Sequence, residues 1–142
     1  MTDIGILRKR VKAVMEQVRR DQADRRVRAA DAAKTFETFL AASAIPAFRA
    51  VANVLKSEGL AFEVMTPSGG VRLMSERNRE DAIELELDGT LDPPQPLVTI
   101  TRARGSRSLR TDRPVKAGTP LQHLSEDDVI EMLLEELRPW LG

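Results

Sequence analysis

The sequence predicts a two-layer α+β fold: a five-stranded antiparallel meander sheet with helices on one face and a long N-terminal helix, in the order α-α-β-β-β-β-β-α. Apolar residues recur at helical spacing before Gly59 and after Ser125. Between these segments they alternate with polar residues, which is typical of an antiparallel sheet with one face in water. Turns rich in glycine and proline separate the alternating segments and favour pairing of consecutive strands. Helices at the ends of the chain and strands in its middle indicate an α+β fold.

The composition is that of a soluble, single-domain protein. The 142 residues are 42% hydrophobic and 31% charged, and a chain of this length buries roughly two-thirds of its unfolded surface. No apolar run approaches the ~20 residues of a membrane helix, and we expect no secretory signal. The absence of cysteine excludes disulfides and thiolate metal sites. We therefore expect a cytoplasmic, bacterial protein with no membrane partner.

The net charge is zero, with 22 basic and 22 acidic residues, but the two signs occur in blocks. Residues 1–30 and 97–120 each carry a net charge of +5, whereas residues 60–96 and 121–142 each carry −5. Such blocks can neutralise one another within a fold or between subunits, or they can leave a basic surface for an external partner.

Residues 1–34 are predicted to form a basic helix that mediates dimerisation. Apolar residues there follow the alternating three- and four-residue spacing of a coiled-coil interface over two heptads. The next positions in phase are Asp21 and Arg25, so we expect one long helix or two helices broken near Asp21–Asp24. Because two heptads rarely hold a coiled coil alone, the segment is interpreted as part of a larger dimer interface. The predicted interface residues are Ile4, Leu7, Val11, Val14 and Val18.

Residues 35–142 are predicted to form a single α+β domain. Pro46 fits the first turn of a helix and disfavours helical geometry just before it, so we expect a tight joint over Ala41–Ile45. A second helix then covers Ile45–Glu58, and Gly59 ends it with the left-handed conformation that glycine adopts at low cost.

Five alternating segments follow this helix, and a last helix closes the chain. The predicted strands are Leu60–Thr66, Val71–Ser75, Ala82–Asp88, Leu97–Arg104 and, at an edge, Arg107–Arg113. The last helix begins after Ser125, which is expected to form a capping box with Asp128, and ends near Leu137.

No group of residues predicts catalysis, a cofactor or a metal site. His123, the only histidine, lies in a predicted loop where no partner is fixed by the sequence. Glu84, Glu86 and Asp88 share one strand face and could bind a divalent cation. We interpret them as a solvated face paired with basic neighbours, such as those of the following strand. The sequence contains no phosphate-binding loop and no nucleophile–base set.

Arginines are concentrated on the last hairpin, and these residues are the candidates for binding a polyanion: Arg102, Arg104, Arg107, Arg110 and Arg113. The hairpin has no aromatic side chain for base stacking, so we favour pairing with the protein's own acidic strand or acidic C-terminal helix. The basic N-terminal helix could lie along a nucleic-acid backbone or on an anionic membrane surface, but we favour a dimerisation helix with a charged exterior.

The function expected from the sequence is a non-catalytic binding or adaptor module that self-associates, as a dimer, through its N-terminal helix. A protein partner is compatible with this reading. One alternative is a nucleic-acid-associated protein that uses the basic helix and the Arg-rich hairpin. Another is a small-ligand binder or enzyme with a pocket between helices and sheet, which would need several polar groups in one concavity.

Overall fold

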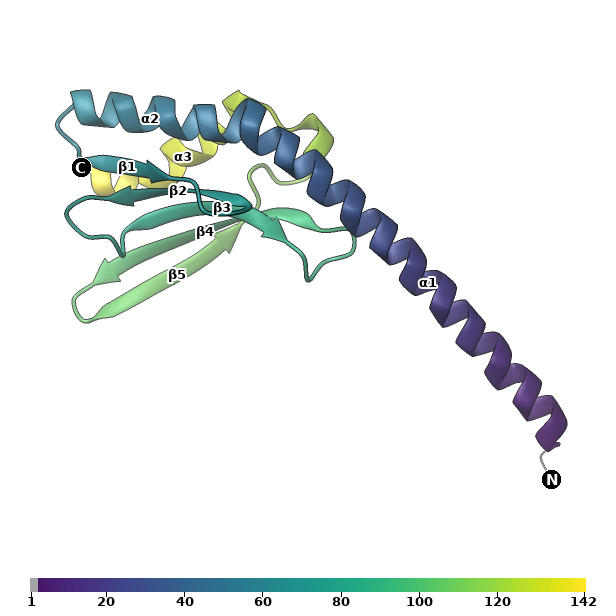
Figure 1. The fold of residues 1–142 in the computed structure, drawn as a ribbon. Coiled ribbons are helices and arrows are strands. Elements are labelled where there is room, and N and C mark those ends of the chain that lie inside the picture. The colour runs from purple at the N-terminus through teal and green to yellow at the C-terminus, as the bar shows by residue number, and fades with distance from the viewer. Residues whose placement is uncertain (1–2) are drawn as a thin grey trace.

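In the computed structural model, which describes residues 3–142, the chain has the predicted α+β fold (Figure 1). Helix α1 (Ile4–Phe39) continues through a π-helical turn (Leu40–Ala44) into α2 (Ile45–Ser57), and α3 (Glu126–Leu141) closes the chain. The strands between α2 and α3 are β1 (Phe62–Met65), β2 (Gly70–Ser75), β3 (Ala82–Asp88), β4 (Gln95–Arg104) and β5 (Arg107–Arg113).

The strands form one antiparallel sheet in sequence order, β1-β2-β3-β4-β5, as the meander prediction requires. Val71, Leu85 and Val98 face one another on three successive strands and are all fully buried. In the next row Arg72, Glu84 and Thr99 point to the opposite, open face of the sheet. This alternation places one face against the helices and the other in water.

Helices α2 and α3 cover the inner face of the sheet and supply the other half of the core (Figure 1). Phe48 of α2 and Leu133 of α3 are completely buried. Apolar residues follow the helical period on both helices, so each presents one stripe to the sheet and a polar face to water. Gly59 ends α2 at φ +88°, the left-handed conformation that was predicted.

The predicted tight joint before Pro46 is wrong, because the chain stays helical from α1 into α2. Proline lacks an N–H, and in a regular α-helix its ring would meet the carbonyl four residues earlier, that of Ala42. A π-helical turn removes this conflict, since the Ile45 N–H bonds to the Leu40 carbonyl, five residues back. Of the two predicted forms of the N-terminal segment, one long helix is correct, and α1 passes unbroken through Asp21–Asp24.

Helix α3 extends to Leu141, beyond the predicted end near Leu137. Pro139 lies in its last turn, and Trp140 packs against Phe62 of β1 with ring centroids 6.1 Å apart. This contact keeps the end of the helix on the sheet. At its start the predicted capping box is present: the Ser125 hydroxyl accepts from the Asp128 N–H, and the Asp128 carboxylate accepts from the Ser125 N–H.

One helical segment meets the length and composition of a membrane span. The continuous helix Ile4–Ser57 contains an 18-residue window with a mean hydropathy of 1.4, of which 44% is buried inside the fold. The core helix of a soluble protein passes the same test, so this window is weak evidence for a membrane segment.

Candidate functional site

The first part of α1 projects from the domain as a single helix (Figure 1). Every residue from Asp3 to Arg28 is exposed, and Ala29 is the first whose side chain is half-buried. At 1.5 Å per residue the free segment is roughly 37 Å long. The Asp3 carboxylate caps it by accepting hydrogen bonds from the Gly5 and Ile6 N–H groups, at 2.8 and 3.3 Å.

The five predicted interface residues form an exposed row on this projecting segment, here called the apolar stripe. Their exposed fractions are Ile4 72%, Leu7 45%, Val11 49%, Val14 62% and Val18 46%. Met15, half exposed, lies beside the stripe and widens it. Scattered exposed apolar residues are ordinary on soluble proteins, but a contiguous row of this kind is typical of an interaction surface.

The apolar stripe is the direct continuation of the face by which α1 packs on its own domain. Eighteen residues make five helical turns, so residues eighteen apart point in the same direction. Val18 is therefore aligned with the buried Phe36, and Val11 with the half-buried Ala29. The face of α1 that packs on the core thus continues past the edge of the domain, where its residues are exposed.

A bidentate ion pair joins α1 to the domain at the point where the helix leaves the domain. The Arg28 Nε and Nη2 atoms donate to the two carboxylate oxygens of Asp92, in the β3–β4 loop, at 2.9 and 2.8 Å. These hydrogen bonds lower the pKa of Asp92 below its usual value. Arg28 thereby marks the boundary between the anchored and the projecting parts of the helix.

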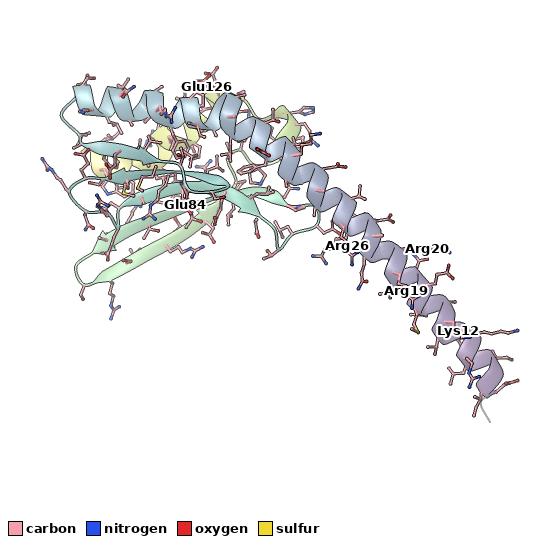
Figure 2. The ribbon with its side chains drawn as sticks, in the orientation of Figure 1. Lys12, Arg19, Arg20, Arg26, Glu84 and Glu126 are labelled. Carbon is pink, nitrogen blue, oxygen red and sulfur yellow. The ribbon has the colours of Figure 1, made fainter. Side chains whose placement is uncertain are left out.

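Basic side chains line one flank of the projecting segment beside the apolar stripe. Arg8, Lys12, Arg19 and Arg26 recur at spacings of whole helical turns, and none of them has an ion-pair partner within residues 3–142. Figure 2 shows that Lys12, Arg19 and Arg26 all extend from the part of α1 beyond the domain.

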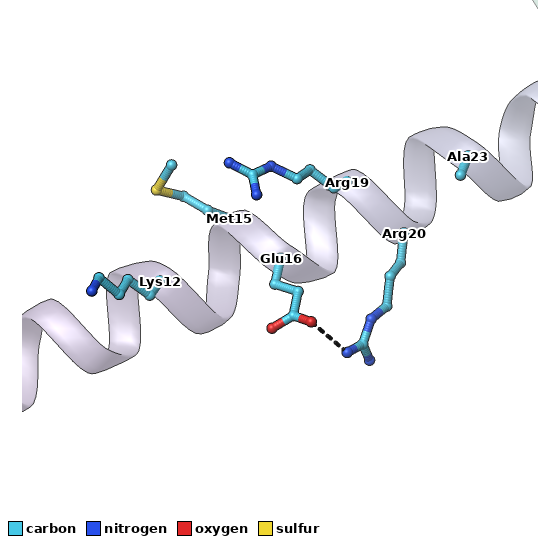
Figure 3. A pocket seen from close by; sticks show the side chains of 6 residues that line it. All are labelled: Lys12, Met15, Glu16, Arg19, Arg20 and Ala23. Carbon is cyan, nitrogen blue, oxygen red and sulfur yellow. Dashed lines mark hydrogen bonds and ion pairs between the residues drawn. The ribbon is translucent and has the colours of Figure 1, made fainter.

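A shallow hollow of about 700 Å³ runs along this basic flank (Figure 3). It is lined by Lys12, Met15, Glu16, Arg19, Arg20 and Ala23. Glu16 and Arg20 form an ion pair of 2.8 Å across one turn of the helix, drawn as the dashed line in Figure 3. Because side chains of a single helix bound it, the hollow is open to solvent and does not enclose a small molecule.

The five candidate arginines of the last hairpin do not form one patch. The strand register places Arg110 on the open face, beside Asp112, and the other four on the face that carries the helices. Arg102 contacts Glu136 at 3.4 Å and lies 5.3 Å from the centre of the Trp140 ring. Arg104 and Arg107 face each other at the turn and have no ion pair within the described part of the chain.

Arg113 is held most firmly of the five. It contacts Glu135 at 2.7 Å and Glu136 at 3.1 Å, so the hairpin is tied to the acidic helix α3. Its partial burial alone would lower the pKa of the guanidinium, but the hydrogen bonds to the two carboxylates outweigh this effect and raise the pKa. Arg102 and Arg113 therefore serve the fold, whereas Arg104 and Arg107 at the hairpin turn keep their positive charge unpaired within the described part of the chain.

In the acidic row of β3, Glu84 has a basic neighbour on the preceding strand and none on the following strand. Glu84 contacts Arg72 of the preceding strand at 3.8 Å, whereas the following strand places Thr99 opposite it. Across residues 3–142, no three histidine, cysteine or acidic side chains form a group suited to a metal ion. His123 is exposed in a 3₁₀ turn, and its side chain makes no hydrogen bond with any described residue.

The interface between helices and sheet is apolar. Ser75, 8% exposed, is the only polar residue among the buried residues in the described part of the chain. A cleft of about 520 Å³ lies between the π-helical turn and the β1–β2 turn, where Phe36, Leu40 and Leu87 contribute apolar walls and Glu37 the only charged side chain. Thr66 and Ser68 of the β1–β2 turn add two hydroxyl groups to its lining.

The chain matches no family model, no curated protein and no solved structure. The candidate site is therefore defined by its own geometry. Sequence reasoning found the apolar stripe but missed its alignment with the domain-packing face and the bond from Arg28 to Asp92. The alignment could have been found from the sequence, because Val18 and Phe36 are eighteen residues apart and so lie on the same face of a helix. The ion pair joins residues far apart in the sequence, and no local pattern marks it.

Proposed function

We propose that this protein is a non-catalytic binding module that self-associates through the apolar stripe of α1. The observation that carries the proposal is the exposure of five aliphatic side chains in one row on a helix whose residues are all exposed from Asp3 to Arg28. Removing this apolar surface from water is favourable, at roughly 25 cal/mol per Å². A second copy of the same stripe offers a surface of matching chemistry, and association would leave the two domains free to bind other molecules.

The test is the mass of the full chain in solution, measured by sedimentation velocity or light scattering over a range of concentrations. We expect a dimer that dissociates on dilution. The variant Leu7→Ala/Val11→Ala/Val18→Ala should be monomeric, because it truncates the stripe while keeping good helix formers. The matched control is Ile6→Ala/Val27→Ala, which truncates two aliphatic residues, 59% and 60% exposed, off the stripe. A monomeric wild-type chain, or equal loss in both variants, would contradict the proposal.

A second candidate function is binding of nucleic acid along the basic flank of α1. It is favoured by cations on that flank that have no ion-pair partner within residues 3–142. Binding of generic duplex DNA should weaken steeply as the salt concentration rises. The variant Lys12→Gln/Arg19→Gln/Arg26→Gln should make the slope of log affinity against log salt concentration shallower by the contribution of about three phosphate contacts. Arg104→Glu/Arg107→Glu tests the contribution of the hairpin turn. Absence of salt-dependent binding at low ionic strength would exclude this function.

We place the module in the cytoplasm. The absence of cysteine supports this setting, because the fold draws no stability from an oxidising compartment. Expression of the chain fused to a fluorescent protein in bacterial cells tests it, and fluorescence confined to the cell envelope would contradict it.

A further inference from the structure

We infer that two copies of α1 pair in an antiparallel direction, so that the two domains lie at opposite ends of a short helical rod. The inference rests on the self-association proposed above and adds its direction and register. It follows from three features of the projecting segment: the face that the stripe occupies, the charges that follow it, and the spacing of its aliphatic residues.

The position of the stripe restricts a parallel partner. The stripe lies on the same face of α1 as Ala29 and Phe36, which pack on the domain. A second helix that ran parallel along this face would therefore meet the first protomer's own domain beyond Arg28, near the loop that holds Asp92. An antiparallel helix leaves the stripe at the capped start of α1, at the end of the segment away from this domain.

The charges that follow the stripe also oppose a parallel pair. In a symmetric parallel pair each residue faces its own copy, so Asp21 would meet Asp21 and Arg25 would meet Arg25 across the interface. Both residues are exposed and continue the spacing of the stripe. Like charges that face each other in this way are destabilising. In an antiparallel pair neither residue faces its own copy.

The spacing of the aliphatic residues selects one antiparallel register. When Val11 of one protomer faces Val14 of its partner, Leu7 faces Val18, and both contacts occur twice by symmetry. These four positions are the stripe without Ile4, which faces the partner's Asp21, and their exposed fractions in the single chain run from 45% to 62%. This register buries all four on each helix, whereas a shift by one heptad would place Leu7 or Val18 against a charged residue or beyond the end of the helix.

The flanking residues are compatible with the same register. Arg8 then lies beside the partner's Met15, and Arg10 beside the partner's Gln17, so the basic residues nearest the interface contact neutral side chains. Asp21 lies beside the N-terminus of the partner helix, where the helix dipole favours a negative charge. Ala29 follows Val18 by eleven residues, or roughly 16 Å, so each domain begins beyond the end of the other helix.

Cysteine cross-linking tests the direction, because the natural chain has no cysteine. Leu7→Cys and Val18→Cys are prepared separately, one carrying a size tag, and are oxidised alone and mixed in a glutathione redox buffer. We expect a disulfide dimer only in the mixture, and only between the two different chains. A disulfide requires Cα atoms within about 7 Å, and in this register two copies of position 7 are offset by roughly 16 Å along the helix. Ile6→Cys mixed with Val18→Cys is the off-stripe control.

Two results separate the direction from the self-association itself. Sedimentation of each reduced variant reports whether dimers form: monomers throughout would overturn both the proposed function and this inference. Dimers in which Leu7→Cys and Val18→Cys each cross-link to themselves would overturn the antiparallel direction and leave the self-association standing. Dimers without any cross-link, or equal cross-linking of Ile6→Cys, would overturn the register.

Discussion

Truncation of Val11 to alanine is the sharpest single-residue test of the apolar stripe. Val11 lies in the middle of the stripe and is 49% exposed in the single chain. The substitution removes two methyl groups, worth about 1.6 kcal/mol if fully buried at 0.8 kcal/mol each. Because roughly half of this surface is still in water before association, the loss on dimerisation is about 0.8 kcal/mol per protomer.

The loss counts twice in a symmetric dimer, and Val11→Ala should therefore weaken association by about 1.6 kcal/mol, or roughly 15-fold in Kd. Alanine has a higher helix propensity than valine. The helix itself is then somewhat more stable in the variant, so weaker association cannot be attributed to unfolding of α1. The Kd is measured by sedimentation equilibrium at several loading concentrations.

Val27→Ala is the matched control for this measurement. Val27 lies on the same exposed helix and is 60% exposed, but it is nine residues from Val18 and so on the opposite side from the stripe. The control gains the same helix propensity and loses the same two methyl groups. We expect its Kd to equal that of the wild type. Equal weakening by Val11→Ala and Val27→Ala would refute the assignment of the interface to the stripe.

Three further predictions concern the fold. Phe48→Ala should lower the free energy of unfolding by about 3–5 kcal/mol, seen as a lower urea midpoint, because the ring is fully buried between helices and sheet. Ser125→Ala should cost about 1 kcal/mol, measured the same way, because it removes half of the capping box. Asp92→Asn should speed hydrogen exchange around Arg28. The hydrogen bonds from Arg28 lower the pKa of the Asp92 carboxyl in the folded protein. The stability that this ion pair contributes is therefore fully present above the pKa of Asp92 in the unfolded chain, and it is lost as the pH falls through the lower pKa of the folded protein. The thermal midpoints of variant and wild type should therefore differ at pH 7 and converge at acidic pH.

The sequence was sufficient for the fold because its local signals agree with one another. Ala82–Asp88 alternates strictly, and the predicted strand has the observed bounds. Ser125 and Asp128 supply a complete helix start, and Gly59 a complete helix end. In each case the residues that decide the structure are neighbours in the sequence.

Predictions were wrong where two local tendencies conflict or where the partner is distant. Pro46 signals a helix start, and a break was therefore expected before it, but the helical tendency of its surroundings prevailed through a π-helical turn. The following strand was named as one source of a basic partner for Glu84, but the cation that contacts it is Arg72 on the preceding strand. No local pattern distinguishes these alternatives, because strand order decides which cation comes close.

The charge blocks of the sequence differ in how far their charges are paired inside the fold. The basic block that includes the last hairpin is partly neutralised inside the fold, since Arg102, Arg113 and Lys116 contact acidic residues of α3. The basic N-terminal block makes one ion pair with the rest of the domain, from Arg28, within residues 3–142. The same segment carries the exposed apolar stripe. Unburied apolar surface and unneutralised charge thus coincide on α1, and a single bound partner would satisfy both. In the proposed antiparallel dimer the second copy would bury the stripe and leave the basic flank in water. The flank would then be open to an anionic molecule in the dimer as well as in the single chain.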